Sequence, residues 1–210
     1  MKTESDSAKP SVATSRLDGA TRDEILRSAA ALIASEGYQA CTMRSISKKI
    51  QMKAGSLYHH FSSKDELLLE VMNVGVRMIL EQVAHQVSSM PPTASFEDRL
   101  RVAIRAHATC MVDQSMPFIR VYEHLPPVIK RQARVTRKQY SDFWLSFLES
   151  GKQAGEVNPD LNLTLFVPFL LSGLNRVSDW YRDHMNVNEI ADLIADTCLG
   201  GIRERFTPRA

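Results

Sequence analysis

Residues 42–64, TMRSISKKIQMKAGSLYHHFSSK, decide the fold that we expect for this chain. The first part predicts a short helix beginning at Thr42, because its apolar residues recur at a spacing of three and four and therefore share one face. These residues are Met43, Ile46 and Ile50. We expect this face to pack on a core.

A second short helix is predicted after a break of three residues, Gln51-Met52-Lys53. The same apolar spacing returns there at Ala54, Leu57 and Phe61. Two short helices joined by such a turn are typical of a helix-turn-helix. The outward positions of the second helix would be Lys53, Gly55, Ser56, Tyr58 and His59.

The same stretch carries five basic residues and no acidic one. The basic residues are Arg44, Lys48, Lys49, Lys53 and Lys64. The whole chain of 210 residues has a formal net charge of only +2, so this excess is local and is offset elsewhere. A local basic face on a helix-turn-helix indicates a surface for a polyanion such as DNA.

The sequence LYHHFSSKDELL at residues 57–68 resembles the DNA-binding domain of the TetR family of one-component transcriptional regulators. The segment before it is similar too, with Thr42, Arg44 and Ile46 in matching places. The likeness is strong over residues 21–75 and elsewhere extends only to length and helical character. It implies an operator-binding regulator, most often a repressor, with a helical C-terminal domain for an effector and for dimerisation.

The sequence departs from the family pattern at one turn residue. Gln51 stands where the family usually has glycine, at a position that needs a left-handed backbone. Such a backbone is easy for glycine and costs on the order of 1 kcal/mol for other residues. The departure bears on the geometry of the turn and not on the fold.

The chain is predicted to be all-α, because no alternating run is long enough for a useful strand. We expect a flexible tail over residues 1–20, the helix-turn-helix domain over 21–66, and an effector-binding and dimerisation domain over 67–210. The tail could contact DNA phosphates through its basic residues, or it could simply be solvated. Those basic residues are Lys2, Lys9 and Arg16.

Capping patterns and breaks predict where the helices begin and end. Thr21 with Glu24, and Ser63 with Glu66, read as capping boxes at two helix starts. The helix after Ser63 would link the two domains. The expected spans are Thr21 to Gly37, Ser63 to about Ser88, Ser95 past Met111, Pro126 to about Gly151, Leu163 to His184, and Asn188 to about Arg205.

The Leu163–His184 segment is apolar on two faces, which predicts burial on both sides. The first stripe is Leu163, Val167, Leu170, Leu174, Val177 and Tyr181, and the second is Phe166, Phe169, Gly173 and Trp180. One stripe could face the core and the other a second subunit. A stripe on the last helix, at Ile190, Leu193, Ile194, Thr197 and Gly201, would complete a four-helix homodimer interface suited to palindromic DNA.

Ten residues are expected to contact DNA. Thr42 and Lys64 stand at helix starts, where phosphates bind, and Gly55 near the start of the recognition helix permits close approach to bases. Tyr58 and His60 match family positions that contact the backbone, although each could instead pack or cap. Lys48 and Lys49 could be only a solvated face. The ten are Thr42, Arg44, Lys53, Ala54, Gly55, Ser56, Tyr58, His59, His60 and Lys64.

The C-terminal half offers soft and aromatic residues for a ligand pocket, although most such residues in proteins are core. Residues 175–182 are similar to a Trp-Tyr-Arg segment of acyl-CoA-responsive TetR regulators. By that resemblance Arg176 or Arg182 could hold a CoA phosphate, or pair with Asp179. A fatty acid, sterol or drug fits the aromatic content equally well. The ligand candidates are His107, Met111, Phe118, Tyr122, Trp144, Phe147, Phe166, Arg176 and Trp180.

Other classes of protein find less support. Three scattered cysteines suit a reduced, cytoplasmic setting, and no apolar run is long enough for a membrane span. We expect no cofactor and no metal, because no nucleotide-binding, metal-ligand or nucleophile motif is present. A helical enzyme using histidines such as His107 and His184 stays an alternative, as does a DNA-binding protein without an effector.

Overall fold

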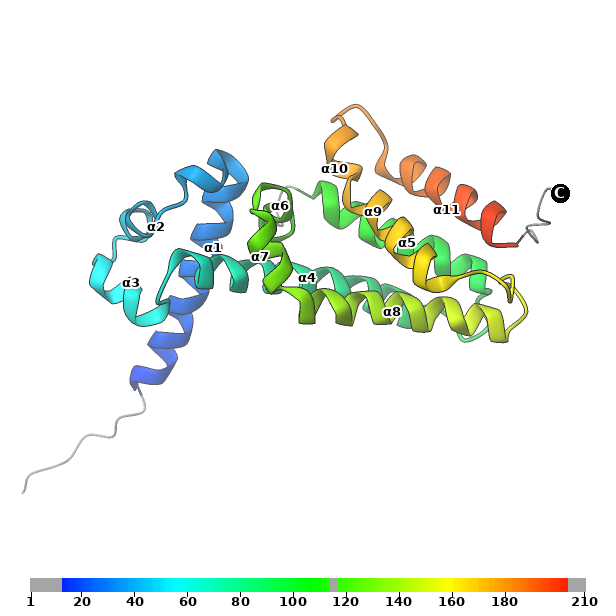
Figure 1. Cartoon of the computed structure of the whole chain (residues 1–210), viewed down its shortest axis with the longest axis horizontal. Coiled ribbons are helices and arrows are strands. Elements are labelled where there is room, and N and C mark those ends of the chain that lie inside the picture. Colours follow the sequence, from blue (N-terminus) through cyan, green and yellow to red (C-terminus); the bar gives the residue numbers. More distant parts are fainter. Residues whose placement is uncertain (1–12, 114–116, 204–210) are drawn as a thin grey trace, which may run out of the picture.

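The computed structural model describes residues 13–113 and 117–203. These residues form eleven helices and no strand, which confirms the all-α prediction (Figure 1). The helices are α1 (Ala13–Ala40), α2 (Met43–Lys49), α3 (Ala54–His60), α4 (Lys64–Ser88), α5 (Phe96–Val112), α6 (Pro117–His124), α7 (Pro127–Gln132), α8 (Arg134–Gln153), α9 (Leu163–Asn175), α10 (Val177–Trp180) and α11 (Val187–Arg203).

Some predicted helix bounds are confirmed and others are wrong. The linking helix α4 has the predicted bounds, and its N-cap Ser63 accepts a hydrogen bond from the Glu66 amide at 3.1 Å. Helix α1 instead begins at Ala13, so Thr21 lies inside it and is not an N-cap. Residues 13–20 contain no proline, and nothing in them stops the helix from extending.

Two helices that we expected to be continuous are broken. Ala133, with φ −73° and ψ 19°, separates α7 from α8. Arg176, with φ −101° and ψ 6°, ends α9, and the chain leaves the helical conformation altogether after Trp180. Ile129, before the first break, and Val177, after the second, are both fully buried.

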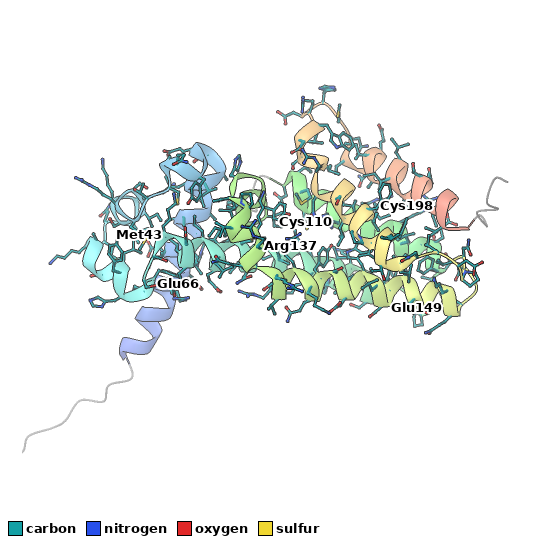
Figure 2. The ribbon with its side chains drawn as sticks, in the orientation of Figure 1. Met43, Glu66, Cys110, Arg137, Glu149 and Cys198 are labelled. Atoms are coloured by element: carbon teal, nitrogen blue, oxygen red, sulfur yellow. The ribbon has the colours of Figure 1, made fainter. Side chains whose placement is uncertain are left out.

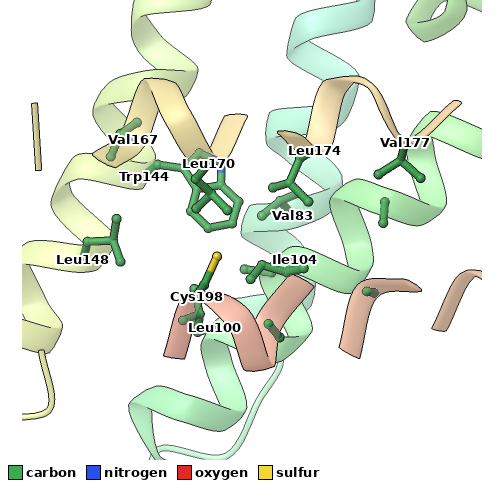
Figure 3. Packing of buried hydrophobic residues seen from close by; sticks show 14 of the residues in the cluster. Val83, Leu100, Ile104, Trp144, Leu148, Val167, Leu170, Leu174, Val177 and Cys198 are labelled. Atoms are coloured by element: carbon green, nitrogen blue, oxygen red, sulfur yellow. The ribbon is translucent and has the colours of Figure 1, made fainter. Parts of the chain in front are cut away.

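Two hydrophobic cores share α4. Its first half contributes Leu67, Leu68 and Val71 to the N-terminal core, where they meet α1, α2 and α3. Its second half contributes Ile79 and Val83 to the C-terminal core, which Figure 3 shows closing around Trp144 of α8 between α5, α9 and α11. One helix is therefore rigidly packed at both ends.

Helices α6 and α7 also reach the N-terminal core. Val121, Leu125 and Ile129 are almost completely buried there, although they lie far along the chain. Helix α6 crosses α4 at Gly75, where an added Cβ would stand 2.4 Å from the Phe118 carbonyl oxygen. Only glycine permits this close crossing, so α6 is pressed against α4 between the two cores.

The turn between α2 and α3 has the left-handed residue that we predicted. Gln51 has φ 54°, and it occupies the position that follows the C-cap of α2. The Met52 amide donates to the Ser47 carbonyl at 2.9 Å and the Gln51 amide to the Lys48 carbonyl at 3.3 Å, which is the Schellman pattern. The same pattern closes α8, where Gly155 takes the left-handed position with φ 75°.

One polar pair is buried in the C-terminal core. His107 Nδ1 lies 2.7 Å from the Tyr140 hydroxyl oxygen. Burial lowers the pKa of His107 to about 4, an effect that a hydrogen bond to Asn175 only partly offsets. Nε2 makes no well-formed hydrogen bond among the described residues, so the contact with Asn175 stabilises the charged form only weakly. His107 is therefore neutral at pH 7.

Replacing Gln51 by glycine is expected to stabilise the protein by about 0.5–1 kcal/mol, because it removes left-handed strain at the cost of extra unfolded-state entropy. Gln139→Gly is the matched control, since Gln139 is exposed in the middle of α8, where glycine should cost about 1 kcal/mol. Urea denaturation at equal protein concentration measures both. Destabilisation by both variants would contradict a strained turn.

Acidification should weaken the fold through His107. The unfolded chain binds a proton at this residue below its ordinary pKa of 6.5, whereas the folded chain does so only near 4. Stability should therefore fall as the pH drops through this window, by up to about 3 kcal/mol. The variant His107→Gln should lose less stability over the same window in urea denaturation. Equal losses in both proteins would show that His107 is not responsible.

Candidate DNA-binding surface and ligand cavity

The predicted start of α2 at Thr42 is built as a reciprocal cap. Thr42 Oγ1 accepts a hydrogen bond from the Ser45 amide at 3.0 Å, and Ser45 Oγ accepts one from the Thr42 amide at 2.8 Å. This arrangement fixes the start of α2. It also engages the amide and the hydroxyl oxygen of Thr42, both of which we had expected to be available to a phosphate.

Helix α3 is anchored on one side and open on the other. Leu57 and Phe61 are 0% and 1% exposed in the N-terminal core. Every other predicted contact residue of α3 except the half-buried His60 is exposed, and Tyr58 is 55% exposed. Ala54 belongs to this open side, so the prediction that it continues the inward spacing is wrong. The exposed residues are Lys53, Ala54, Gly55, Ser56, Tyr58 and His59.

An arginine that we had not predicted holds the end of α3. Arg22 of α1 donates from Nη1 to the His60 carbonyl at 3.0 Å, and its guanidinium carbon lies 4.2 Å from the centroid of the Phe61 ring. This combined hydrogen bond and cation–π contact fixes α3 relative to α1. The sequence gives no sign of it, because the partners are far apart along the chain.

Lys64 does not point outward. Its ammonium donates to the Tyr38 carbonyl at 2.7 Å and lies 3.6 Å from the centroid of the Tyr38 ring. In this conformation the charge ties the start of α4 to the end of α1, and the phosphate contact expected of Lys64 stays a prediction. A strongly hydrated ammonium can be held this way because a carbonyl and a ring face both attract it.

A carboxylate also helps to fix the start of α4. Both the amide and the hydroxyl of Ser62 donate to Glu66 Oε2, at 2.8 and 2.6 Å. These hydrogen bonds lower the pKa of Glu66. Glu66 thus reaches Ser62 rather than the N-cap Ser63, one residue further than in the predicted capping box.

The remaining basic residues of the stretch face solvent. Arg44, Lys48, Lys49 and Lys53 are all exposed, and among the described residues none of them has a carboxylate partner. These four cations without carboxylate partners lie on and between two short helices and form a positive surface beside the exposed side of α3. We call these residues and the exposed side of α3 the DNA-binding surface.

A cavity of about 390 Å³ lies between the two cores. It is walled by α4, α5, α6, α8 and α9, and its lining mixes apolar residues with hydroxyl, amide and guanidinium groups. Four of the nine predicted ligand residues line it, namely Met111, Phe118, Tyr122 and Arg176. The arrangement suits a small, largely apolar molecule.

Five predicted ligand residues do not line this cavity. His107 and Trp144 are fully buried in the C-terminal core, where Trp144 packs edge-on against Tyr140. Phe147 stacks on Phe96 away from the cavity. His107, Trp144 and Phe147 therefore pack in the core and do not form part of the cavity wall. The others are the half-buried Phe166 and Trp180, which is 42% exposed near the end of α10.

Several wall residues were missed by the sequence analysis. Helix α4 gives Met72, Gly75, Val76 and Ile79 to the wall, although the sequence presents it only as a link. The glycine in the middle of an otherwise strong helix was the one available indication of a close approach. The other missed wall residues are Ile119, Arg137, Tyr140, Ser141, Pro168, Leu171, Ser172 and Asn175.

Two arginines stand at the cavity with different partners. Arg176 pairs with Asp179 at 2.8 Å, which is the alternative that we had kept open for it. Arg137 has no carboxylate partner among the described residues, and its guanidinium carbon lies 5.6 Å from the centroid of the Tyr122 ring. Among the described residues, Arg182 donates to the backbone carbonyls of Asp179 and Tyr181.

The basic side chains of the predicted N-terminal tail are not described by the structure. Lys2 and Lys9 lie outside the described residues, as does the side chain of Arg16.

Within the described part of the chain, no group of His, Cys, Asp and Glu side chains could hold a metal ion, and no helix is long and apolar enough to cross a membrane. Burial raises the pKa of all three cysteine thiols to about 11.

Two family models match the chain and together account for both cores. Residues 25–71 match the model described as bacterial regulatory proteins, tetR family. Residues 93–202 match the model described as Tetracyclin repressor-like, C-terminal domain. The second match alone covers more than half of the chain.

Known proteins similar to the chain agree with these models. The transcriptional repressor KstR2 of Mycobacterium tuberculosis is 27% identical over 188 residues, covering 86% of this chain and 92% of KstR2. A structure of AibR with isovaleryl coenzyme A and operator DNA is 26% identical with a TM-score of 0.68, covering 88% of this chain and 99% of AibR. The fold also matches FadR from Bacillus halodurans, with a TM-score of 0.76 at 19% identity, over 88% and 97% of the chains.

The helix-turn-helix, the helical C-terminal domain and both family models lead to one conclusion. TetR-family proteins are DNA-binding regulators and not enzymes, which removes the helical-enzyme alternative. The chain belongs to the TetR family of bacterial transcriptional regulators.

Proposed function

We propose that this regulator is a repressor that binds a palindromic operator as a homodimer in the cytoplasm and is released by a small, largely apolar effector. The observation that carries the proposal is the cavity between the two cores, whose walls include α4 and α6. Both helices also pack in the core that supports the DNA-binding surface. A molecule in the cavity therefore touches the elements that position α3.

The DNA-binding surface reads the operator through the start of α3. Lys53, Gly55 and Ser56 would meet base edges in the major groove, with Arg44 and Tyr58 at the flanking backbone. Ala54, His59 and the half-buried His60 complete this proposed contact set. With several phosphate contacts in each subunit, operator affinity should fall steeply as salt rises.

The dimer forms through the exposed sides of α9 and α11. The first predicted stripe of α9 is buried, with Leu170 and Leu174 at 3% and 0% exposure, while Leu165 and Phe169 are 70% and 71% exposed. Large apolar groups gathered on one side of a helix mark a surface for interaction with another protein. Further along the same side Gly173 has open space around it, so a partner helix can approach closely.

Helix α11 presents a matching exposed side. Arg101 and Arg105 of α5 hold Asp196 and Asp192 at 2.6 and 2.7 Å, which fixes the rotation of α11. Leu193, 65% exposed, then faces outward, and the two glycines at 200 and 201 follow two turns later. Two helices from each subunit make a four-helix interface with two-fold symmetry.

The effector is proposed to be an acyl-CoA or a fatty acid-like molecule. The cavity is of the size that binds small ligands, and the similarity to AibR, whose structure holds isovaleryl coenzyme A, supports an acyl group. The ligand contacts proposed from the geometry are Met111, Phe118, Tyr122 and Arg176, together with Arg137 and the wall of α4.

Release follows from the crossing of α6 and α4. Phe118 lines the cavity, and its carbonyl oxygen is the atom that a side chain at Gly75 would meet first. An effector that moves α6 or α4 would change the spacing of the two recognition helices, which operator binding requires to be about 34 Å. A hundredfold loss of operator affinity requires the effector to favour the released state by about 2.7 kcal/mol.

Gly55→Ala is expected to leave the free protein at least as stable, because a Cβ at this position meets nothing within 4 Å and alanine favours a helix. Affinity for a duplex selected from a random pool should nonetheless fall about tenfold or more, or about 1.4 kcal/mol, because the methyl group meets DNA. Ser146→Ala, exposed on α8, is the control. Fluorescence anisotropy measures binding, and unchanged affinity for Gly55→Ala would overturn this placement of α3.

Charges placed on the proposed interface should separate the subunits. Phe169→Arg with Leu193→Arg is expected to convert the dimer into monomers, since two buried cations would lack partners. Val135→Arg is the matched control, because Val135 is 73% exposed on α8 and lies outside the interface. Analytical ultracentrifugation gives the mass. A wild-type monomer, or a dimer that survives the double substitution, would refute this interface.

A further inference from the structure

We infer that the start of α8 and the end of α7 carry a site for the phosphate-bearing headgroup of an amphiphilic effector. Between Glu123 and Asp142 the sequence has five basic residues and no acidic one. We call these residues the α7–α8 basic face; they are Lys130, Arg131, Arg134, Arg137 and Lys138. The inference deepens the proposed function and rests on it, because it concerns a ligand of the same cavity.

The basic face begins at the rim of the cavity. The Tyr122 ring lines the cavity and is contacted by two of its cations, with Lys130 Nζ 4.6 Å and the Arg137 guanidinium carbon 5.6 Å from its centroid. Figure 2 places Arg137 where the α6–α7 segment meets α8. A ligand that leaves the cavity past Tyr122 would therefore meet positive charge at once.

The face then continues along α8 away from the cavity. Arg134, Arg137 and Ser141 are spaced three and four residues apart and so share one side of the helix. Arg137 and Ser141 line the cavity, and Arg134 lies one turn further out, exposed. Arg131, exposed in the last turn of α7, adds a further charge beyond it.

These charges are not explained by the fold. Among the described residues no carboxylate pairs with Arg131, Arg134 or Arg137, whereas Lys138 pairs with Asp142 at 2.5 Å. Arg134 is also the first residue of α8, which has no acidic residue in its first turn and no side-chain cap. A cation there opposes the helix dipole, whereas an anion would be stabilised by it.

The number of cations indicates the class of ligand. One carboxylate would need only one arginine at the rim, which Arg137 already supplies. Three arginines without carboxylate partners suit a group with several negative charges, and arginine binds phosphate oxygens in pairs. The ligand class is thus an acyl chain joined to a phosphate or pyrophosphate group. DNA is a less suitable partner, because α1 and the start of α4 separate α7 from α3 (Figure 1).

The test compares three probes on the protein without DNA, namely octanoate, octanoyl-CoA and coenzyme A alone. Calorimetry should show octanoyl-CoA binding about tenfold or more tighter than octanoate, since only the thioester brings phosphates. Arg131→Gln with Arg134→Gln should weaken octanoyl-CoA and coenzyme A by about tenfold, and octanoate by less than about twofold. Duplex affinity and unfolding temperature of this variant should stay at wild-type values.

Two controls separate this face from other arginines. Arg27→Gln with Lys49→Gln removes two exposed charges from α1 and α2 and should leave all three probes unaffected. Arg182→Gln tests the arginine that the sequence resemblance suggested for a phosphate. If Arg182→Gln weakens octanoyl-CoA while the Arg131 and Arg134 substitutions do not, the headgroup lies elsewhere and the inference is overturned.

The remaining outcomes are also decisive. If octanoate and octanoyl-CoA bind the cavity equally and the double variant changes neither, the inference fails while the proposed effector site stands. If the double variant weakens duplex binding instead, the face is a DNA contact. If neither acyl probe binds, both the effector proposal for this cavity and the headgroup site are contradicted.

Discussion

The structure depends on one close crossing, where the backbone of α6 lies against Gly75 of α4. Any side chain at Gly75 would collide with the Phe118 carbonyl, so the two helices are held at a distance that only glycine allows. Because α4 belongs to both cores and α6 to the N-terminal core and the cavity wall, this crossing joins the ligand cavity to the DNA-binding surface.

The DNA-binding surface is held in place before any DNA arrives. Leu57 and Phe61 anchor α3 from below, Arg22 fixes its last residue, and Lys64 joins the start of α4 to the end of α1. The side chains left outside are those that would reach a duplex. A preorganised surface loses less entropy on binding, and in the proposed mechanism small movements of α4 or α6 would be transmitted to it as rigid shifts.

The sequence was sufficient for features that depend on local patterns. Ser63 predicted the start of α4 and the prolines at 91 and 92 its end, and the resemblance marked Gln51 as the turn position usually held by glycine, where the backbone is indeed left-handed. The breaks at Ala133 and Arg176 were missed, because tertiary packing and not a local breaker redirects the chain there. The cavity wall was only partly predicted, since aromatic residues such as Trp144 pack equally well in a core. The inward turn of Lys64 could not be seen either, because its partner Tyr38 is distant in sequence.

The most direct test of the account is the coupling between the cavity and the duplex. Operator affinity would be measured with and without saturating octanoyl-CoA, and octanoyl-CoA affinity with and without saturating duplex. If the crossing at Gly75 couples the two sites, each ligand must weaken the other by the same factor, which we expect to be about tenfold or more. An acyl ligand shown to bind the cavity that leaves operator affinity unchanged would contradict the account.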